Sequence, residues 1–205
     1  MDRDSPQATL NVAAVHVGSR ALGPGWRSIV WVQGCPFQCA GCVSPDWIPQ
    51  RPATPMAVAE LVATLLADPL VDGLTFSGGE PMLQAAGLAE VAAQARELRD
   101  VSLICYTGHR IEHLRGRGAS PGVDALLAQV DVLIDGLYRA DHNDGVGLRG
   151  SSNQRVHHLT QRLADPVHDF ESRPRRVEVY RSGEDVLFVG VPPVGLDELL
   201  MGAVR

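Results

Sequence analysis

The chain has 205 residues, 45% hydrophobic and 20% charged, so it can build one domain with a sizeable core and is neither disordered nor collagen-like. It is shorter than the roughly 250 residues that a complete eight-fold βα barrel usually takes. A formal net charge of -6 argues against nucleic acid as a partner, and the absence of a long apolar run argues against a membrane span.

Short apolar runs alternate with amphipathic helical patterns, which predicts an α/β domain with a mainly parallel sheet over residues 1–205. The expected strands cover residues 10–17, 28–32, 74–76, 101–106 and 132–134. The expected helical segments cover residues 58–66, 88–98, 111–114 and 123–130. Thr54 followed by Pro55 is typical of a helix N-cap with proline at the first helical position.

The remainder of the chain completes a partial barrel. Residues 139–150 form a polar stretch that predicts a loop, and the runs 177–180 and 186–189 predict a closing C-terminal hairpin. About six βα-like units of 30 or more residues each fit the length. We therefore expect an incomplete, TIM-like βα barrel with a laterally open side, wide enough to admit a loop of a large protein.

Three of the four cysteines crowd into one segment with the spacing CxxxCxxC, namely Cys35, Cys39 and Cys42. Thiolates bind soft metals and iron-sulfur clusters, and three of them on one loop can hold three corners of a cubane. The fourth iron would then stay open to a substrate or cofactor. No secretory signal opens the chain, so we expect a cytoplasmic protein whose thiols stay reduced.

Two other interpretations of the cysteines remain open at this point. Structural zinc prefers four ligands, and His16 or Cys105 could complete such a site only by approaching in the folded protein. The thiols could also be unrelated buried side chains. Cys105 itself lies in an apolar strand, which favours a buried, inert thiol.

A second motif, Thr75-Phe76-Ser77-Gly78-Gly79-Glu80-Pro81, lies about 40 residues after the cysteines, where a strand ends and a helix begins. Ligands bind at this end of the strands in open α/β sheets and barrels. The two glycines allow a ligand to approach the backbone, and Glu80 offers an acceptor to a cationic group such as an amine.

The pairing of these two motifs resembles the radical S-adenosylmethionine (SAM) superfamily. Further segments resemble the activating proteins of anaerobic ribonucleotide reductases, and they share short, ordered motifs across most of the chain: Gly23–Arg27, Trp31–Cys35, Cys105–Gly108, Val130–Gly136 and Arg149–Arg155. The resemblance implies that Cys35, Cys39 and Cys42 ligate a [4Fe-4S] cluster in the loop 34–43. It also implies that SAM chelates the open iron.

The same resemblance implies roles for other residues. Gly78, Gly79, Glu80 and Pro81 would frame the methionine end of SAM, with Glu80 near its amino group. The remaining candidates would lie on the rim of the SAM and substrate pocket: Asp135, Asn153 and Arg155. This chemistry requires no acid-base residue, so no catalytic side chain is assigned, and His157 and His158 are expected to be non-catalytic.

The function implied is reductive cleavage of SAM to methionine and a 5′-deoxyadenosyl radical, with an electron from an external low-potential donor. The radical would abstract hydrogen from a partner such as a large glycyl radical enzyme. After the third cysteine the chain continues Val43-Ser44-Pro45-Asp46-Trp47, where many activating proteins have Asn, and this departure weakens the assignment of the partner. The alternatives are a radical SAM enzyme acting on a small molecule or peptide and a non-catalytic iron-sulfur or zinc module.

Overall fold

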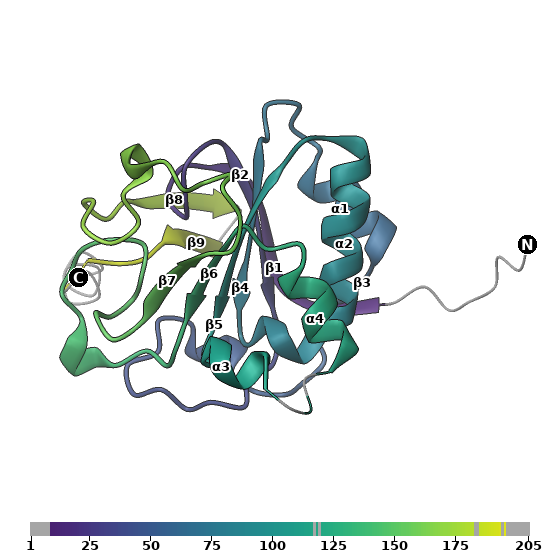
Figure 1. Ribbon diagram of the computed structural model, residues 1–205. Helices are drawn as coiled ribbons and strands as arrows, with labels where there is room; N and C mark the ends of the chain where they lie inside the picture. Colours follow the sequence, from purple (N-terminus) through teal and green to yellow (C-terminus); the bar gives the residue numbers. More distant parts are fainter. Residues whose placement is uncertain (1–8, 117, 119, 183–184, 194, 196–205) are drawn as a thin grey trace, which may run out of the picture.

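A seven-stranded sheet with the spatial order β3-β1-β2-β4-β5-β6-β7 forms the centre of the computed structural model, which describes residues 9–116, 118, 120–182, 185–193 and 195 (Figure 1). Its strands are β1 (Thr9–Ser19), β2 (Arg27–Val32), β3 (Thr54–Ala57), β4 (Gly73–Gly78), β5 (Ser102–Thr107), β6 (Val132–Asp135) and β7 (Arg155–His158). The central strands β2, β4, β5 and β6 run parallel, and β1, β3 and β7 are added by antiparallel pairing. The predicted α/β class with a mostly parallel central sheet is confirmed.

Helices cover one face of this sheet. Figure 1 shows α1 (Val58–Leu65), α2 (Ala85–Leu98) and α4 (Pro121–Leu127) lying together on that face, with the short α3 (Ile111–Leu114) near the end of β5. Their apolar stripes meet the buried strand residues in the main core, which includes Phe76, Leu88 and Leu103. Because the parallel strands are buried on both faces, their sequences are continuous apolar runs.

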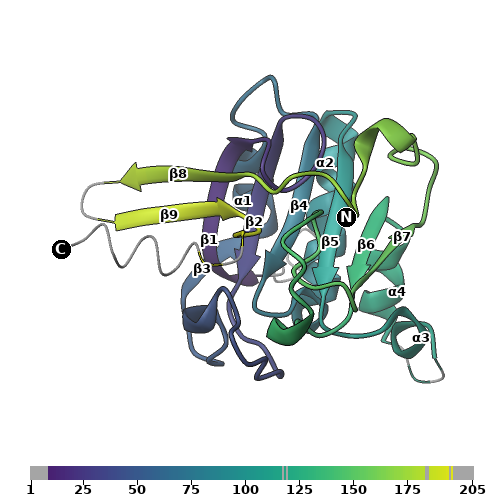
Figure 2. The ribbon, with the colours of Figure 1, turned by 90° about the vertical axis from the view of Figure 1, so that its left-hand side faces the viewer.

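The opposite face carries a hairpin and a long connecting segment. The hairpin consists of β8 (Val177–Ser182) and β9 (Asp185–Gly190), and Figure 2 shows it crossing in front of β1 and β2. Residues 136–154 and 159–176 contain the short 3-10 helices η3 (Ala140–His142) and η4 (Pro166–His168). Leu187 and Val189 of the hairpin pack with Ile29 and Trp31 of the sheet. The predicted hairpin is confirmed, and residues 183–184 of its turn lie outside the described part of the chain.

Two local predictions were wrong. Thr54 and Pro55 do not cap a helix, because they pair with Val12 and Asn11 in the edge strand β3, where a proline is tolerated. Helix α1 begins three residues after Pro55, with Ala57 as its N-cap. Strand β7 was missed, because Arg-Val-His-His has no apolar run and its pairing with β6 is a tertiary contact.

Arg27 is a fully buried cation and the first residue of β2. Its guanidinium donates to Thr75 Oγ1 (2.9 Å), Ser102 Oγ (2.8 Å) and backbone carbonyls that include Pro24 and Leu74. Burial lowers the pKa of Arg27 to about 10. The side chain therefore joins three parallel strands at the end of the sheet away from the cysteines.

Candidate active site

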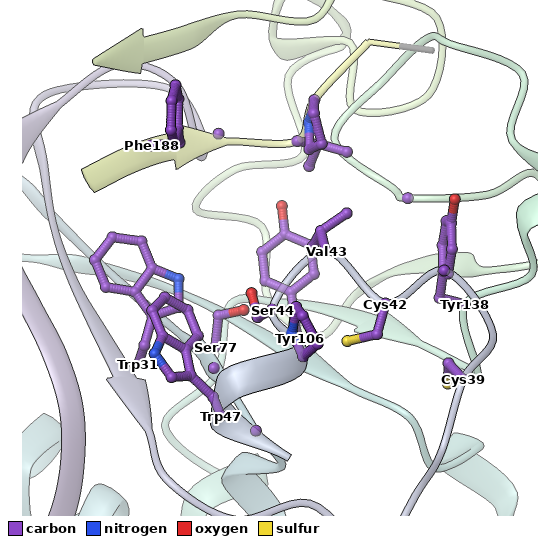
Figure 3. Close-up of a pocket in the computed structure, with 18 of the residues that line it drawn as sticks. Trp31, Cys39, Cys42, Val43, Ser44, Trp47, Ser77, Tyr106, Tyr138 and Phe188 are labelled. Atoms are coloured by element: carbon purple, nitrogen blue, oxygen red, sulfur yellow. The ribbon is translucent and has the colours of Figure 1, made fainter. Parts of the chain in front are cut away.

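The carboxyl ends of the parallel strands open into one cavity of about 1100 Å³ (Figure 3). Each strand contributes lining residues just beyond its end: Cys35 after β2, Gly79 and Glu80 after β4, Gly108 after β5 and Gly136 after β6. Ligands of open α/β sheets bind at this edge. Hairpin residues of β9 form the wall across from the cysteine loop.

The cysteine loop is held at its two ends by backbone hydrogen bonds. Gly34 N donates to Trp47 O and Cys35 N donates to Ile48 O, both at 2.9 Å. The Gln33 side chain also donates to Pro49 O at 2.7 Å. The loop is therefore closed at its base by main-chain contacts, which leaves its cysteine side chains free to face the cavity.

Cys35, Cys39 and Cys42 are free, half-buried thiols that line this one cavity. Burial raises the pKa of Cys35 and of Cys39, and the neighbouring thiols and Glu80 raise both further. A bound metal centre would relieve this by stabilising the thiolates. Among the described residues no three His, Cys, Asp or Glu side chains converge to metal-binding distance, so the thiols share a wall at wider spacing. In donor type and number they fit a [4Fe-4S] cluster.

The Gly-Gly-Glu-Pro turn packs directly against the cysteine loop. Gly79 N donates to Val32 O (2.7 Å) and Glu80 N donates to Gly34 O (2.8 Å). Gly78 has a φ of +109°, and a Cβ on Gly79 would lie 2.1 Å from Gly34 O. Gly79 is therefore required by the contact between the turn and the cysteine loop, and Gly78 by its positive φ and its close approach to the backbone of Val32 in β2. Pro81 is buried at the start of the 3-10 helix η2 (Pro81–Gln84) and is absent from the residues that line the cavity.

Glu80 is a buried carboxylate that links this turn to β5. It is 1% exposed and accepts hydrogen bonds from Met82 N (2.9 Å), Thr107 Oγ1 (2.8 Å) and Gly108 N (2.8 Å). Burial raises the pKa of Glu80, although these hydrogen bonds oppose the shift. Its Oε2 accepts only one of the three bonds, so this oxygen retains acceptor capacity toward the cavity.

Asp135, Asn153 and Arg155 lie behind the cavity wall. Fully buried Asp135 accepts from Arg155 Nη2 (2.6 Å), Ile111 N (2.7 Å) and Arg110 Nη1 (3.1 Å). Burial opposes ionisation, but these donors together hold the pKa of Asp135 at about 2. Asn153 Nδ2 donates to a backbone carbonyl at 2.9 Å. None of the three lines the cavity, whereas their neighbours Gly136 and Gln154 do.

Several lining residues escaped the sequence analysis. The Gln154 amide donates to Gly136 O at 2.7 Å and accepts from Gly150 N at 2.8 Å, so it shapes the segment after β6. The hydroxyl of Tyr106 donates to a loop carbonyl at 2.9 Å. Arg175 points its buried guanidinium at loop carbonyls. Of these three residues, Tyr106 lies in the segment Cys105–Gly108 and Gln154 in the segment Arg149–Arg155, both of which carry the family resemblance. Nothing in the sequence around Arg175 indicates its role.

The fold and the cysteine wall together define an iron-sulfur protein. The chain belongs to the 4Fe-4S single cluster domain family, which matches residues 21–157 and thus includes all three clustered cysteines. The match ends before the hairpin β8–β9.

The chain is similar in sequence to two named activating proteins. The chain is 34% identical over 149 residues to the anaerobic ribonucleoside-triphosphate reductase-activating protein of Vibrio cholerae, covering 67% of this chain and 91% of that protein. It is 28% identical over 154 residues to the pyruvate formate-lyase-activating enzyme of Staphylococcus aureus, covering 70% of this chain and 59% of that enzyme.

The chain is also distantly similar to a solved structure. QueE from Escherichia coli matches 63% of this chain and 70% of its own at 14% identity, and its TM-score of 0.41 is too low to support an argument. Within the described residues, none of the helices has the length and apolar character needed to cross a membrane.

Proposed function

We propose that this protein is a radical SAM activating enzyme that forms a glycyl radical on a partner protein such as an anaerobic ribonucleotide reductase. One observation carries the proposal: the cysteine loop and the Gly-Gly-Glu-Pro turn are hydrogen-bonded backbone to backbone at the mouth of a single cavity. The relatives named for the activation of such enzymes support the same reading.

Within this proposal Cys35, Cys39 and Cys42 hold a [4Fe-4S] cluster whose fourth iron takes SAM. Gly78 and Gly79 give the methionine end of SAM access to the backbone, and the free acceptor capacity of Glu80 suits its amino group. The bound cluster and SAM supply a one-electron cleavage of a carbon-sulfur bond, which yields methionine and a 5′-deoxyadenosyl radical. An external low-potential donor supplies the electron.

The chain's own residues orient these groups and keep water away from them. Asp135, Asn153 and Arg155 act on the rim indirectly, because they hold the backbone on either side of Gly136 and Gln154. Trp31 and Trp47, with ring centroids 5.5 Å apart, shield the side of the cavity next to the cysteine loop. The sheet and hairpin then form an incomplete TIM-like barrel, and the free thiols suit a cytoplasmic location.

Anaerobic reconstitution with iron and sulfide, followed by SAM and dithionite, tests the proposal. We expect 5′-deoxyadenosine by chromatography, and a glycyl doublet by electron paramagnetic resonance after addition of the glycyl radical protein of the same organism. A bound cluster without 5′-deoxyadenosine would identify a non-catalytic iron-sulfur module. Formation of 5′-deoxyadenosine without a doublet would redirect the radical to a small molecule or peptide.

A further inference from the structure

The hairpin β8–β9 supplies a wall of the cavity that the family match, residues 21–157, does not include. Figure 3 shows the Phe188 side chain on the face of β9 that points away from Trp31 and Trp47, whereas Leu187 and Val189 belong to the cluster that contains Trp31. The cysteine loop and the strand ends make the cofactor half of the cavity. The hairpin makes the other half.

Among the residues that the structure describes, the edge of β9 opposite β8 pairs with no strand. Strand β9 pairs with β8 on one side, and within the described residues the two strands form a sheet of their own. Figures 2 and 3 both show β9 lying between β8 and the cysteine loop. The cavity is lined by Val186, Leu187, Phe188 and Gly190 of β9, but by Val177 alone of β8. An unpaired strand edge is a template for another strand.

The hairpin is anchored firmly enough to serve as such a template. Its inner face packs on the sheet, where the Tyr180 ring lies 3.8 Å from the His16 ring. Ser19 Oγ donates to Glu178 Oε2 at 2.6 Å, and Tyr180 donates to the same carboxylate at 2.8 Å. Its outer face carries the register partners Val179 and Phe188, which are 60% and 40% exposed.

The chemistry of this wall selects the occupant. Among the described lining residues after position 155, Arg175 is the only one with a charged side chain. Its guanidinium donates hydrogen bonds to backbone carbonyls: Arg149 O at 2.8 Å, Pro192 O at 2.9 Å and Gly150 O at 3.1 Å. Val43, 60% exposed, adds an apolar side chain from the cysteine loop. An uncharged, extended backbone with small side chains therefore fits between the two walls better than a charged ligand.

We propose that the open edge of β9 binds an extended, glycine-bearing segment of the partner protein as an added strand, which presents its glycine to the cofactor half of the cavity. The cavity of about 1100 Å³ lies at the upper end of the range for ligand pockets, and one cavity is lined both by the cysteine loop and by β9. This inference rests on the proposed function and names the surface that selects its partner.

Amide hydrogen exchange of the reconstituted holoenzyme with SAM, with and without the whole glycyl radical protein, tests the added strand. We expect at least tenfold slower exchange in residues 185–190 on complex formation, and unchanged exchange in β3, an edge strand of the seven-stranded sheet. Exchange in β9 that stays unchanged while a glycyl doublet forms would overturn the inference alone. Protection that appears without the partner and grows with enzyme concentration would instead show a second copy on this edge, and would also overturn it.

Side-chain variants give a matched second test. Phe188→Ala should raise the KM for the partner protein at least tenfold while kcat at saturating partner changes less than twofold. Val179 pairs with Phe188 on the neighbouring strand but does not line the cavity. Val179→Ala should therefore leave the KM for the partner protein within twofold. Equal effects of the two variants would contradict the docking role of this wall. Wild-type protein that makes no 5′-deoxyadenosine would mean that the proposed function, rather than the docking surface, has failed.

Discussion

The four cysteines have two different environments. Cys35, Cys39 and Cys42 are half-buried at the cavity, whereas Cys105 is fully buried inside β5. Burial raises the pKa of Cys105 well above its ordinary value, which keeps it a neutral thiol. Position relative to the cavity, rather than residue type, therefore separates candidate ligands from a core residue.

Replacing one thiol of each kind tests this separation. Cys39→Ala should lose the cubane and at least 100-fold of SAM cleavage, because only two clustered thiols remain to hold the iron. Cys105→Ala should retain both, with a loss of about 1 kcal/mol in stability from the small cavity that it leaves. Iron content, visible absorbance and 5′-deoxyadenosine yield measure the outcome. Equal losses in the two variants would make Cys105 a functional residue.

Asp135 gives a pH dependence whose sign follows from its pKa. The folded value of about 2 lies below the roughly 3.9 of an unfolded aspartate, so the folded state favours the ionised form. Its contribution to stability is complete above about pH 4 and is lost as the pH falls toward 2. Asp135→Asn should lower the free energy of unfolding by on the order of 2 kcal/mol at pH 7, because Arg155 and Arg110 lose their shared partner.

Urea unfolding of both proteins between pH 7 and pH 2.5 measures this effect. The difference between wild type and Asp135→Asn should shrink toward the acid end. A difference that is independent of pH would show that the carboxylate charge does not supply the stability.

Arg27 yields a prediction about the opposite end of the sheet. Arg27→Met should cost about 3 kcal/mol, because it leaves buried acceptors such as Thr75 Oγ1 and Ser102 O without their donors. The midpoint of urea unfolding measures it. Arg51→Met, at an exposed position, should stay within about 0.5 kcal/mol and serves as the control. An unfolding midpoint of Arg27→Met equal to that of Arg51→Met would contradict the role of Arg27 in joining the three strands.

At the scale of elements, the contact between two backbone turns organises the site. Gly79→Ala would place a Cβ 2.1 Å from Gly34 O, so the turn and the cysteine loop would have to separate. We expect the variant to retain less than a tenth of the wild-type iron after reconstitution. Gly87→Ala in α2 is a suitable control, because its Cβ would meet only the side chain of Leu10, at 3.1 Å. Full iron loading of Gly79→Ala would show that this contact does not position the loop.

Elements with a local signal were predictable from the sequence, and those defined by tertiary pairing were not. The apolar runs predicted the strands β2, β4, β5 and β6, and the amphipathic stripes predicted the helices α1 and α2. The edge strands β3 and β7 did not, because a Thr-Pro pair suits either a helix start or an edge strand and Arg-Val-His-His is polar. The hairpin was predicted, but its position over β1 and β2 depends on contacts between residues far apart in the chain, such as Ser19 and Glu178, which are 159 positions apart.

The candidate site shows the same division. The cysteine spacing and the Gly-Gly-Glu-Pro turn pointed to residues that the structure brings to one cavity, except for Pro81. Asp135 and Arg155 were expected on the rim, yet their mutual ion pair draws them behind it. Arg175 and Phe188 were missed, since only the folded hairpin places them at the cavity. Their roles, like those of the expected ligands, remain predictions for the experiments above.

At the scale of the whole molecule, the sheet separates two tasks. One face carries the helices and the main core, and the other carries the hairpin (Figures 1 and 2), which lines the cavity at the carboxyl ends of the strands. Substitutions in the helical layer should therefore act on stability, whereas those in the hairpin should act on partner choice. The hairpin lies beyond the residues of the family match and lines the same cavity as the cysteine loop.

Arg175 limits how the cavity can be reached. Its guanidinium binds Asn143 Oδ1 and the carbonyls of Val146, Arg149, Gly150 and Pro192, so it fastens the end of the hairpin to the loop beneath it. Each such bond to a charged donor contributes roughly 1.5–3 kcal/mol, so lifting the hairpin away would break several of them at once. These bonds therefore hold the hairpin in a fixed position over the cavity. If a partner segment binds along β9 as proposed, this fastening requires it to enter from the side of the hairpin rather than from beneath a raised one.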